Sequence, residues 1–131
     1  MSGENAEIVR RHVEAWNRRD RAAYVASFRP DAEIDWSRAR ALYRGVYRGR
    51  EQQKAFWDEF WSTFEDSQQI HDLTEAGSEV VVWNTSHMWG RDGIEVTARS
   101  AIVFTVENGE ITRLRLFHEQ AEALEAVGVS E

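Results

Sequence analysis

The stretch that decides the fold is IEVTARSAIVFTVENGEITRLRLFH, residues 94–118. From Ile94 to Val106, apolar or small residues occupy every second position and mostly polar residues stand between them. This period of two is typical of a β-strand with one face in the core. The tetrapeptide 107–110 contains Asn-Gly, a strong signal for a tight turn, and residues 111–118 alternate again. The stretch therefore predicts an antiparallel hairpin.

Working outward, two more alternating segments lie at residues 67–75 and 79–89, and turn-forming residues separate all four segments. We expect these segments to form an antiparallel meander. The first half of the chain has a helical period instead, with apolar residues three and four positions apart. It predicts helices over 4–18, between Asp20 and Pro30, and over 50–64, with a strand at 32–37; a short helix at 119–127 closes the chain.

Helices followed by a long sheet define an α+β protein. We expect three N-terminal helices packed on a curved antiparallel sheet, followed by a short C-terminal helix. A length of 131 residues fits one domain, residues 1–131, with a sizeable core.

The overall charge and composition exclude several classes of partner. The net charge is −7, which argues against binding nucleic acid or an anionic membrane surface. No apolar run is long enough to span a membrane. The chain has no cysteine, which excludes disulfides and thiolate metal sites and fits a cytoplasmic location.

The whole chain resembles the SnoaL-like members of the nuclear transport factor two superfamily, whose fold is shared with ketosteroid isomerase and limonene epoxide hydrolase. The segments that carry the resemblance are 14–20, 31–36, 46–51, 108–115 and 120–126. The resemblance implies a cone-shaped cystatin-like fold in which the helices cap the concave face of the sheet and leave a pocket. The fold hosts unrelated activities, so the resemblance alone does not define a reaction.

Alternation then predicts the lining of this pocket, if the apolar face of strand 94–106 is the concave one. The predicted ligand-binding residues are Trp16, Ile34, Trp36, Phe56, Phe60, Trp83, Thr85, Trp89, Ser100, Ile102, Leu114 and Leu116. Such a mostly aromatic pocket suits a small hydrophobic or aromatic molecule.

The acids of the resembled enzymes are absent from this chain. The resemblance places the isomerase's general base at Trp36, its neutral acid at Ile102 and its phenol donor at His12. It places the proton-transferring aspartate of the epoxide hydrolase and of SnoaL-type cyclases at Leu116. Neither activity can therefore be transferred to this chain from the family.

Four residues are predicted as candidates for acid–base catalysis. A pair of His87 and His12 is the first, because imidazole exchanges protons near neutral pH, and His118 lies on a neighbouring strand. Asp35 is the fourth candidate, although alternation points it away from Trp36 and Ile34 unless a bulge intervenes. The alternative for each histidine is a hydrogen-bonded core residue.

The expected chemistry needs no cofactor and would be of the isomerase, cyclase or lyase type. No metal is expected, because the histidines show no ligand spacing. Two alternatives stay open: a non-catalytic ligand-binding module, and a dimerisation domain whose core is filled by Trp16, Trp83 and Trp89. We also expect a homodimer through the outer face of the sheet, where Val103 would lie.

Overall fold

The architecture comes from a computed structural model that describes residues 3–39, 44–90 and 93–129. Within these ranges the elements follow one another as α1 (Glu4–Asn17), α2 (Arg21–Ala26), β1 (Phe28–Asp35), β2 (Val46–Arg48), α3 (Gly49–Thr63), β3 (Phe64–Ala76), β4 (Glu79–Gly90), β5 (Glu95–Glu107), β6 (Glu110–Phe117) and α4 (Gln120–Ala126). The predicted α+β class, with helices first and a meander after them, is confirmed.

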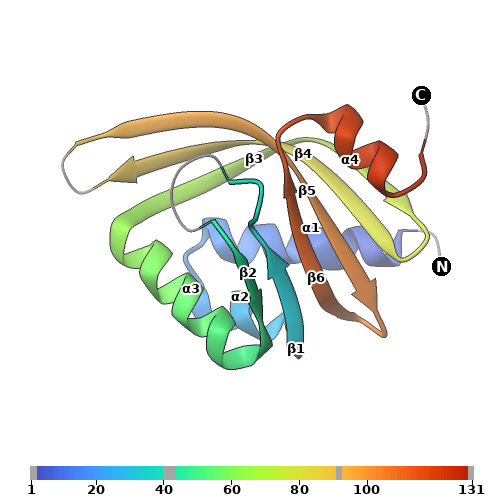
Figure 1. Ribbon diagram of the computed structural model, residues 1–131, viewed down its shortest axis with the longest axis horizontal. Coiled ribbons are helices and arrows are strands. Elements are labelled where there is room, and N and C mark those ends of the chain that lie inside the picture. Colours follow the sequence, from blue (N-terminus) through green and yellow to red (C-terminus); the bar gives the residue numbers. More distant parts are fainter. Residues whose placement is uncertain (1–2, 40–43, 91–92, 130–131) are drawn as a thin grey trace.

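The strands form one curved, open sheet in the order β2-β1-β6-β5-β4-β3 (Figure 1). All neighbouring strands are antiparallel except β1 and β6, which pair in parallel with Ile34 opposite Leu114. The β5–β6 turn lies where the sequence predicts it. Asn108 and Gly109 both have positive φ, 51° and 81°. A tight hairpin turn that matches the right-handed twist of the flanking strands requires such values.

The N-terminal helices present one apolar stripe each. On α1 the buried side chains include Val9, Val13 and Trp16, three or four positions apart. The side chain of Asp20 caps α2 by accepting a hydrogen bond from the Ala23 amide at 3.1 Å. Gly49 begins α3 with a φ of 81°, a conformation that few other residues adopt.

The first strand differs from its prediction. It spans residues 28–35 rather than 32–37, and Pro30 lies inside it instead of ending a helix. The pairing of β1 with β6 is irregular between Phe28 and Glu33, and an irregular stretch tolerates a residue without an N–H group. A short strand, β2, occupies part of the expected loop 38–49. Residues 40–43 of that loop and residues 91–92 of the expected turn 90–93 lie outside the described ranges.

The two faces of the sheet are covered by different helices. α1, α2 and α3 pack on the concave face, and α4 lies against β4, β5 and β6 on the other face (Figure 1). Under α4 the side chains of Val81, Ala101, Val103 and Phe117 are buried. The expectation that this part of the outer face is free for a dimer contact is therefore wrong, because the chain's own C-terminal helix covers Val103.

The predicted orientation of β4 is also wrong. In antiparallel pairing, directly opposed residues share a face. Val82 lies opposite Ile102 and His87 opposite Thr97, so the even-numbered residues of β4 face the helices. The sequence Val80-Val81-Val82-Trp83 does not reveal this orientation. Helices cover both faces of the sheet at this end of β4, so apolar residues occur on both faces of the strand. The outer face consequently carries Trp83, Thr85, His87 and Trp89.

No helix in the described ranges is long and apolar enough to cross a membrane.

Candidate functional site

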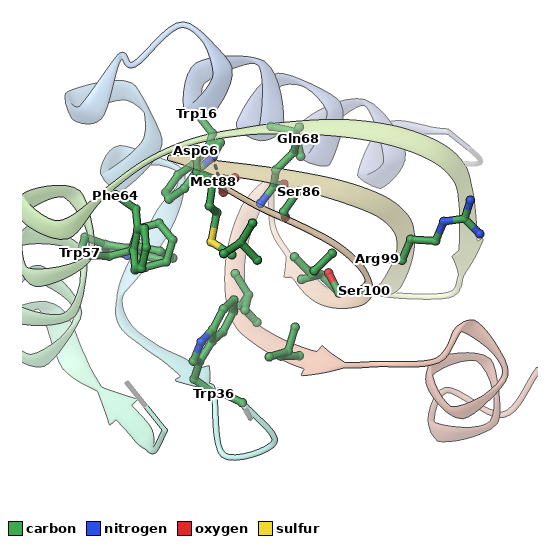
Figure 2. A pocket seen from close by; sticks show the side chains of 18 of the residues that line it. Trp16, Trp36, Trp57, Phe64, Asp66, Gln68, Ser86, Met88, Arg99 and Ser100 are labelled. Atoms are coloured by element: carbon green, nitrogen blue, oxygen red, sulfur yellow. Dashed lines mark hydrogen bonds between the residues drawn. The ribbon is translucent and has the colours of Figure 1, made fainter. Parts of the chain in front are cut away.

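A cavity of about 350 Å³ lies between the helices and the concave face of the sheet. Helices α1, α2 and α3 contribute to its wall together with strands β3 to β6, as the close view in Figure 2 shows in part. Most of the wall is aromatic or aliphatic, including Trp16, Trp36 and Trp57. The guanidinium of Arg99 points away from the interior in Figure 2. Such a cavity favours apolar ligands held by few polar contacts.

Many of the predicted site residues line this cavity. They are His12, Trp16, Trp36, Phe60, Ser100, Ile102, Leu114, Leu116 and His118. Those on β5 and β6 lie there because both strands keep the alternation that the sequence shows. His118 follows directly after β6, and its Nε2 atom is paired with the carbonyl oxygen of Arg38 at 2.5 Å.

Other predicted site residues lie elsewhere. Ile34 and Phe56 are buried in the core without lining the cavity. Trp83, Thr85, His87 and Trp89 are on the outer face, so the predicted His87–His12 pair does not form. The Nδ1 atom of His87 instead lies 3.4 Å from the Thr97 hydroxyl. Those four residues were placed on the wrong face by one error in the orientation of β4.

Asp35 also lies outside the cavity. It pairs with Arg115 of β6, and its Oδ1 atom accepts hydrogen bonds from the Ser37 amide at 3.0 Å and the Ser37 hydroxyl at 2.5 Å. Burial raises the pKa of Asp35, but the bonds from Ser37 and the charges of Arg38 and Arg113 outweigh it and hold the pKa below its usual value. These contacts describe a satisfied carboxylate in a turn.

The acidic group that does line the cavity is Asp66, which the sequence analysis missed. It is 7% exposed, and its Oδ2 atom accepts a hydrogen bond from Trp16 Nε1 at 3.0 Å (Figure 2). Its Oδ1 atom is buried and has no hydrogen-bond partner among the described residues. Burial raises the pKa of Asp66 to about 7, against the opposing effects of the Trp16 hydrogen bond, the nearby Gln68 side chain and Ser67 backbone, and the charge of Arg19.

A signal for Asp66 was present in the sequence. The residue stands between Phe64 and Gln68 at alternate positions, and all three line the cavity from β3. The strand that the sequence predicts begins only at residue 67, which puts Asp66 in the connection after the aromatic helix. Extending the alternation back to Phe64 would have placed the carboxyl on the same face as the apolar residue.

His12 is the second unsatisfied polar side chain of the cavity. It is 1% exposed, and neither ring nitrogen has a hydrogen-bond partner among the described residues. Its ring stacks on Tyr24 at 4.0 Å and meets Phe28 edge-on at 4.9 Å. Burial lowers the pKa of His12 to about 3, so the imidazole is neutral at physiological pH.

Tyr24 connects the two polar groups. Its ring lies 4.0 Å from that of His12 and 4.9 Å from that of Trp16, which in turn holds Asp66. Burial, reinforced by the charge of Asp66, raises the pKa of Tyr24 well above its usual value. The phenol therefore stays protonated, and the cavity combines a neutral imidazole, a phenol and a carboxyl group. In the described part of the chain, no group of three or more metal-ligating side chains is arranged to hold a metal ion.

The curved sheet, the capping helices and the cavity between them define an NTF2-like cone. Residues 9–114 match the model of the SnoaL-like domain, and the chain belongs to this family. Among curated proteins, none matches the chain in sequence.

Solved structures share the fold over almost the whole chain. An NTF2-like protein of unknown function from Burkholderia pseudomallei is 25% identical, with 98% of this chain and 100% of that one covered and a TM-score of 0.77. TerC, co-crystallised with polyporic acid, is 19% identical, with 95% and 98% covered and a TM-score of 0.77. RV0760c from Mycobacterium tuberculosis, in complex with estradiol-17beta-hemisuccinate, is 16% identical, with 88% and 94% covered and a TM-score of 0.76. The predicted family and the cone-shaped fold are confirmed.

Proposed function

We propose that the protein binds a small, flat hydrophobic or aromatic molecule in the cavity. The observation that carries this proposal is a cavity of about 350 Å³ with a mostly aromatic wall and two buried side chains, His12 and Asp66, that have unpartnered polar atoms. Buried polar atoms without partners are costly, and a ligand that pairs with them removes this cost. Two neighbours of the same fold were crystallised with ring-containing ligands, polyporic acid and an estradiol ester.

We further propose cofactor-independent acid–base chemistry of the isomerase, cyclase or lyase type. An ionisable group in an apolar cavity can exchange a proton with a bound molecule when its pKa lies near the working pH. Asp66 meets this condition and His12 does not, since its pKa of about 3 makes it a weak base. The second candidate function is a ligand-binding module without turnover, which fits the loss of the resembled enzymes' acids at Trp36, Ile102 and Leu116.

The filled-core alternative loses its basis. It required Trp16, Trp83 and Trp89 to occupy the cavity together, and Trp83 and Trp89 lie on the outer face. The cytoplasmic location and the absence of a cofactor stay predictions.

Binding is tested by quenching of tryptophan fluorescence, because three of the six tryptophans line the cavity. We expect saturable quenching by at least one class among hydrophobic ketones, polyketide-like aromatics and terpenoid epoxides. The Ala98→Phe variant puts a ring into the cavity and should weaken that binding at least about tenfold, a loss of about 1.4 kcal/mol. Its neighbour Thr97 faces outward, so Thr97→Phe is the matched control and should bind like the wild type.

Equal weakening in both variants would contradict a cavity site, because Ala98 lines the cavity and Thr97 does not. If none of these classes of compound quenches the fluorescence, the proposal that the cavity binds a ligand of this type is contradicted.

We propose that the protein forms a homodimer through the part of the outer face that α4 leaves uncovered. This part carries His87 and Trp89, whose rings stack at 6.4 Å, and Trp89 is 39% exposed. Aromatic side chains among polar ones are typical of protein interfaces. The contact would bury Trp89 against a second copy of the chain.

The Trp89→Glu variant is expected to sediment as a monomer, at half the mass of the wild type, because two buried carboxylates would face each other across a two-fold axis. Val46→Glu alters a similarly exposed apolar residue on β2 and is the control that should stay dimeric. An unchanged mass of the Trp89→Glu protein would refute this interface.

A further inference from the structure

We propose that the carboxylate of Asp66 is the proton acceptor of the cavity and that it acts on a neutral, flat carbon acid whose activated C–H bond lies against Oδ1. The inference rests on the proposed function, since it requires a small molecule in the cavity. It gives the acid–base role to β3, away from the positions at which the resembled enzymes keep their acids.

The geometry of Asp66 fits a positioned base. Trp16 Nε1 holds Oδ2 at 3.0 Å and fixes the plane of the carboxyl, while Oδ1 has no partner in the described part of the chain. The ring of Trp16 is itself held by neighbours, with Tyr24 at 4.9 Å and Trp57 at 5.4 Å. Trp16 is therefore a positioning residue, and the free oxygen of Asp66 is the one that can take a proton.

The groups around Asp66 leave it able to accept that proton near neutral pH. Arg19 is the cation whose charge lowers the pKa of Asp66, and it pairs with Glu65 at 3.3 Å. No described cation bonds directly to Asp66. The polar residues that share the cavity wall on the neighbouring elements are neutral: His12 and Trp16 from α1, Tyr24 from α2 and Gln68 from β3. Strand β4 contributes Met88 opposite Asp66 in the sheet, and Arg99 of β5 points its guanidinium away from the interior (Figure 2). An uncompensated carboxylate in such surroundings is a stronger base than one in water.

These surroundings also select the substrate class. An anionic ligand would lose its hydration against the aromatic wall and meet the like charge of Asp66, so it is disfavoured. A cation that paired with Asp66 would occupy the base, so the proposed reaction requires a neutral molecule. Protons on oxygen or nitrogen exchange rapidly in water without help. A proton on carbon moves slowly, and a base held in place accelerates its removal.

His12 supplies the complementary interaction. A neutral imidazole has one N–H donor and one acceptor nitrogen, and both are buried and unpartnered here. The donor can bind the substrate atom on which negative charge develops when Asp66 removes the proton. His12 of α1 and Asp66 of β3 line the same cavity, and the inference requires one flat molecule to contact both.

Nitrobenzisoxazole is a suitable probe, because it is flat, aromatic and neutral and its ring opens when a base removes the hydrogen on its isoxazole carbon. The proton goes to Asp66 Oδ1, and the C–H electron pair forms the third bond of a nitrile. The N–O bond breaks, and its electron pair stays on the oxygen as a coloured phenolate. Asp66 then returns the proton to water, so the step needs no oxidant, reductant or cofactor.

The experiment measures ring opening and binding of nitrobenzisoxazole by the same proteins. We expect the wild type to open the ring faster than buffer, with kcat/KM rising with pH through about 7. Asp66→Asn keeps the size of the side chain and an acceptor for Trp16, and it should lower kcat/KM by about a hundredfold or more. It should still quench tryptophan fluorescence with the probe. Asp72→Asn changes an exposed carboxyl on the same strand and should keep the wild-type rate.

The outcomes separate this inference from the proposed function. If the probe does not bind the wild type, both are contradicted for neutral aromatic molecules. If it binds but is not opened, or if Asp66→Asn opens it as fast as the wild type, the assignment of Asp66 is overturned and the binding cavity remains. Binding with a rate that Asp66→Asn abolishes and Asp72→Asn preserves supports the assignment.

Discussion

The Asp66→Asn protein is expected to lose about 2 kcal/mol of unfolding free energy when the pH falls from 7 to 5, whereas the wild type changes little. In the wild type, burial raises the pKa of Asp66 from 3.8 to about 7. The folded state therefore binds a proton more tightly than the unfolded state, and protonation of Asp66 stabilises the fold progressively as the pH falls below 7. Asparagine cannot take this proton, so the variant lacks the contribution of Asp66. The destabilising effect of His12, whose pKa burial lowers to about 3, is then unopposed as the pH falls.

Urea unfolding at pH values between 7 and 5 measures this difference. Asparagine also changes stability in a pH-independent way, but such an offset does not alter the slope against pH. A variant profile parallel to that of the wild type would show that the carboxyl of Asp66 does not titrate near neutral pH. It would also remove the electrostatic support for Asp66 as a base.

The His12→Phe protein is expected to change in the opposite direction, gaining about 2 kcal/mol of unfolding free energy over the same fall in pH. Burial lowers the pKa of His12 from 6.5 to about 3. The unfolded state binds the proton more tightly, so the wild type loses stability from this residue as the pH falls through 6.5. Phenylalanine does not titrate, which leaves the stabilising contribution of Asp66 unopposed.

At pH 7 the His12→Phe variant should also be at least as stable as the wild type, because a phenyl ring replaces an imidazole whose two nitrogens are buried without partners. Combining both substitutions provides the control. The double variant lacks both titrating groups, so its stability should depend on pH about as weakly as that of the wild type. A steep profile in the double variant would mean that another group dominates this pH range.

The sequence predicts well those strands in which polar residues mark most of one face, even where α4 covers part of that face. Strands β5 and β6 keep a clean alternation, so Ser100, Ile102, Leu114 and Leu116 lie in the cavity as predicted from the pattern. Asn108-Gly109 predicts the turn between them for a local reason, since both residues must adopt positive φ. These features depend on neighbours in sequence and need no knowledge of the tertiary structure.

The prediction fails where tertiary contacts decide. Helices cover both faces of β4 near Val81 and Val82, so hydrophobicity alone does not tell which residues face the cavity. The orientation follows only from the pairing with β5, and the error moved His87 into the predicted site. The sequence does not predict Asp66 because β3 begins at Phe64, directly after Thr63, the last residue of α3. No turn residue marks the boundary between the helix and the strand.

The parallel pairing of β1 with β6 bears on how the chain folds during synthesis. Arg113 Nε binds Glu33 Oε2 at 3.1 Å across a separation of 80 residues, and the other neighbour of β1 in the described sheet is the short strand β2. Closing so large a loop costs entropy before any contact compensates for it, which slows folding. During synthesis β1 therefore lacks its long partner strand until β6 has been made. Strand β6 lies between β1 and β5 and joins the two parts of the sheet. Substitutions in β6 should therefore slow folding more than substitutions in α4 that lower the free energy of unfolding by the same amount.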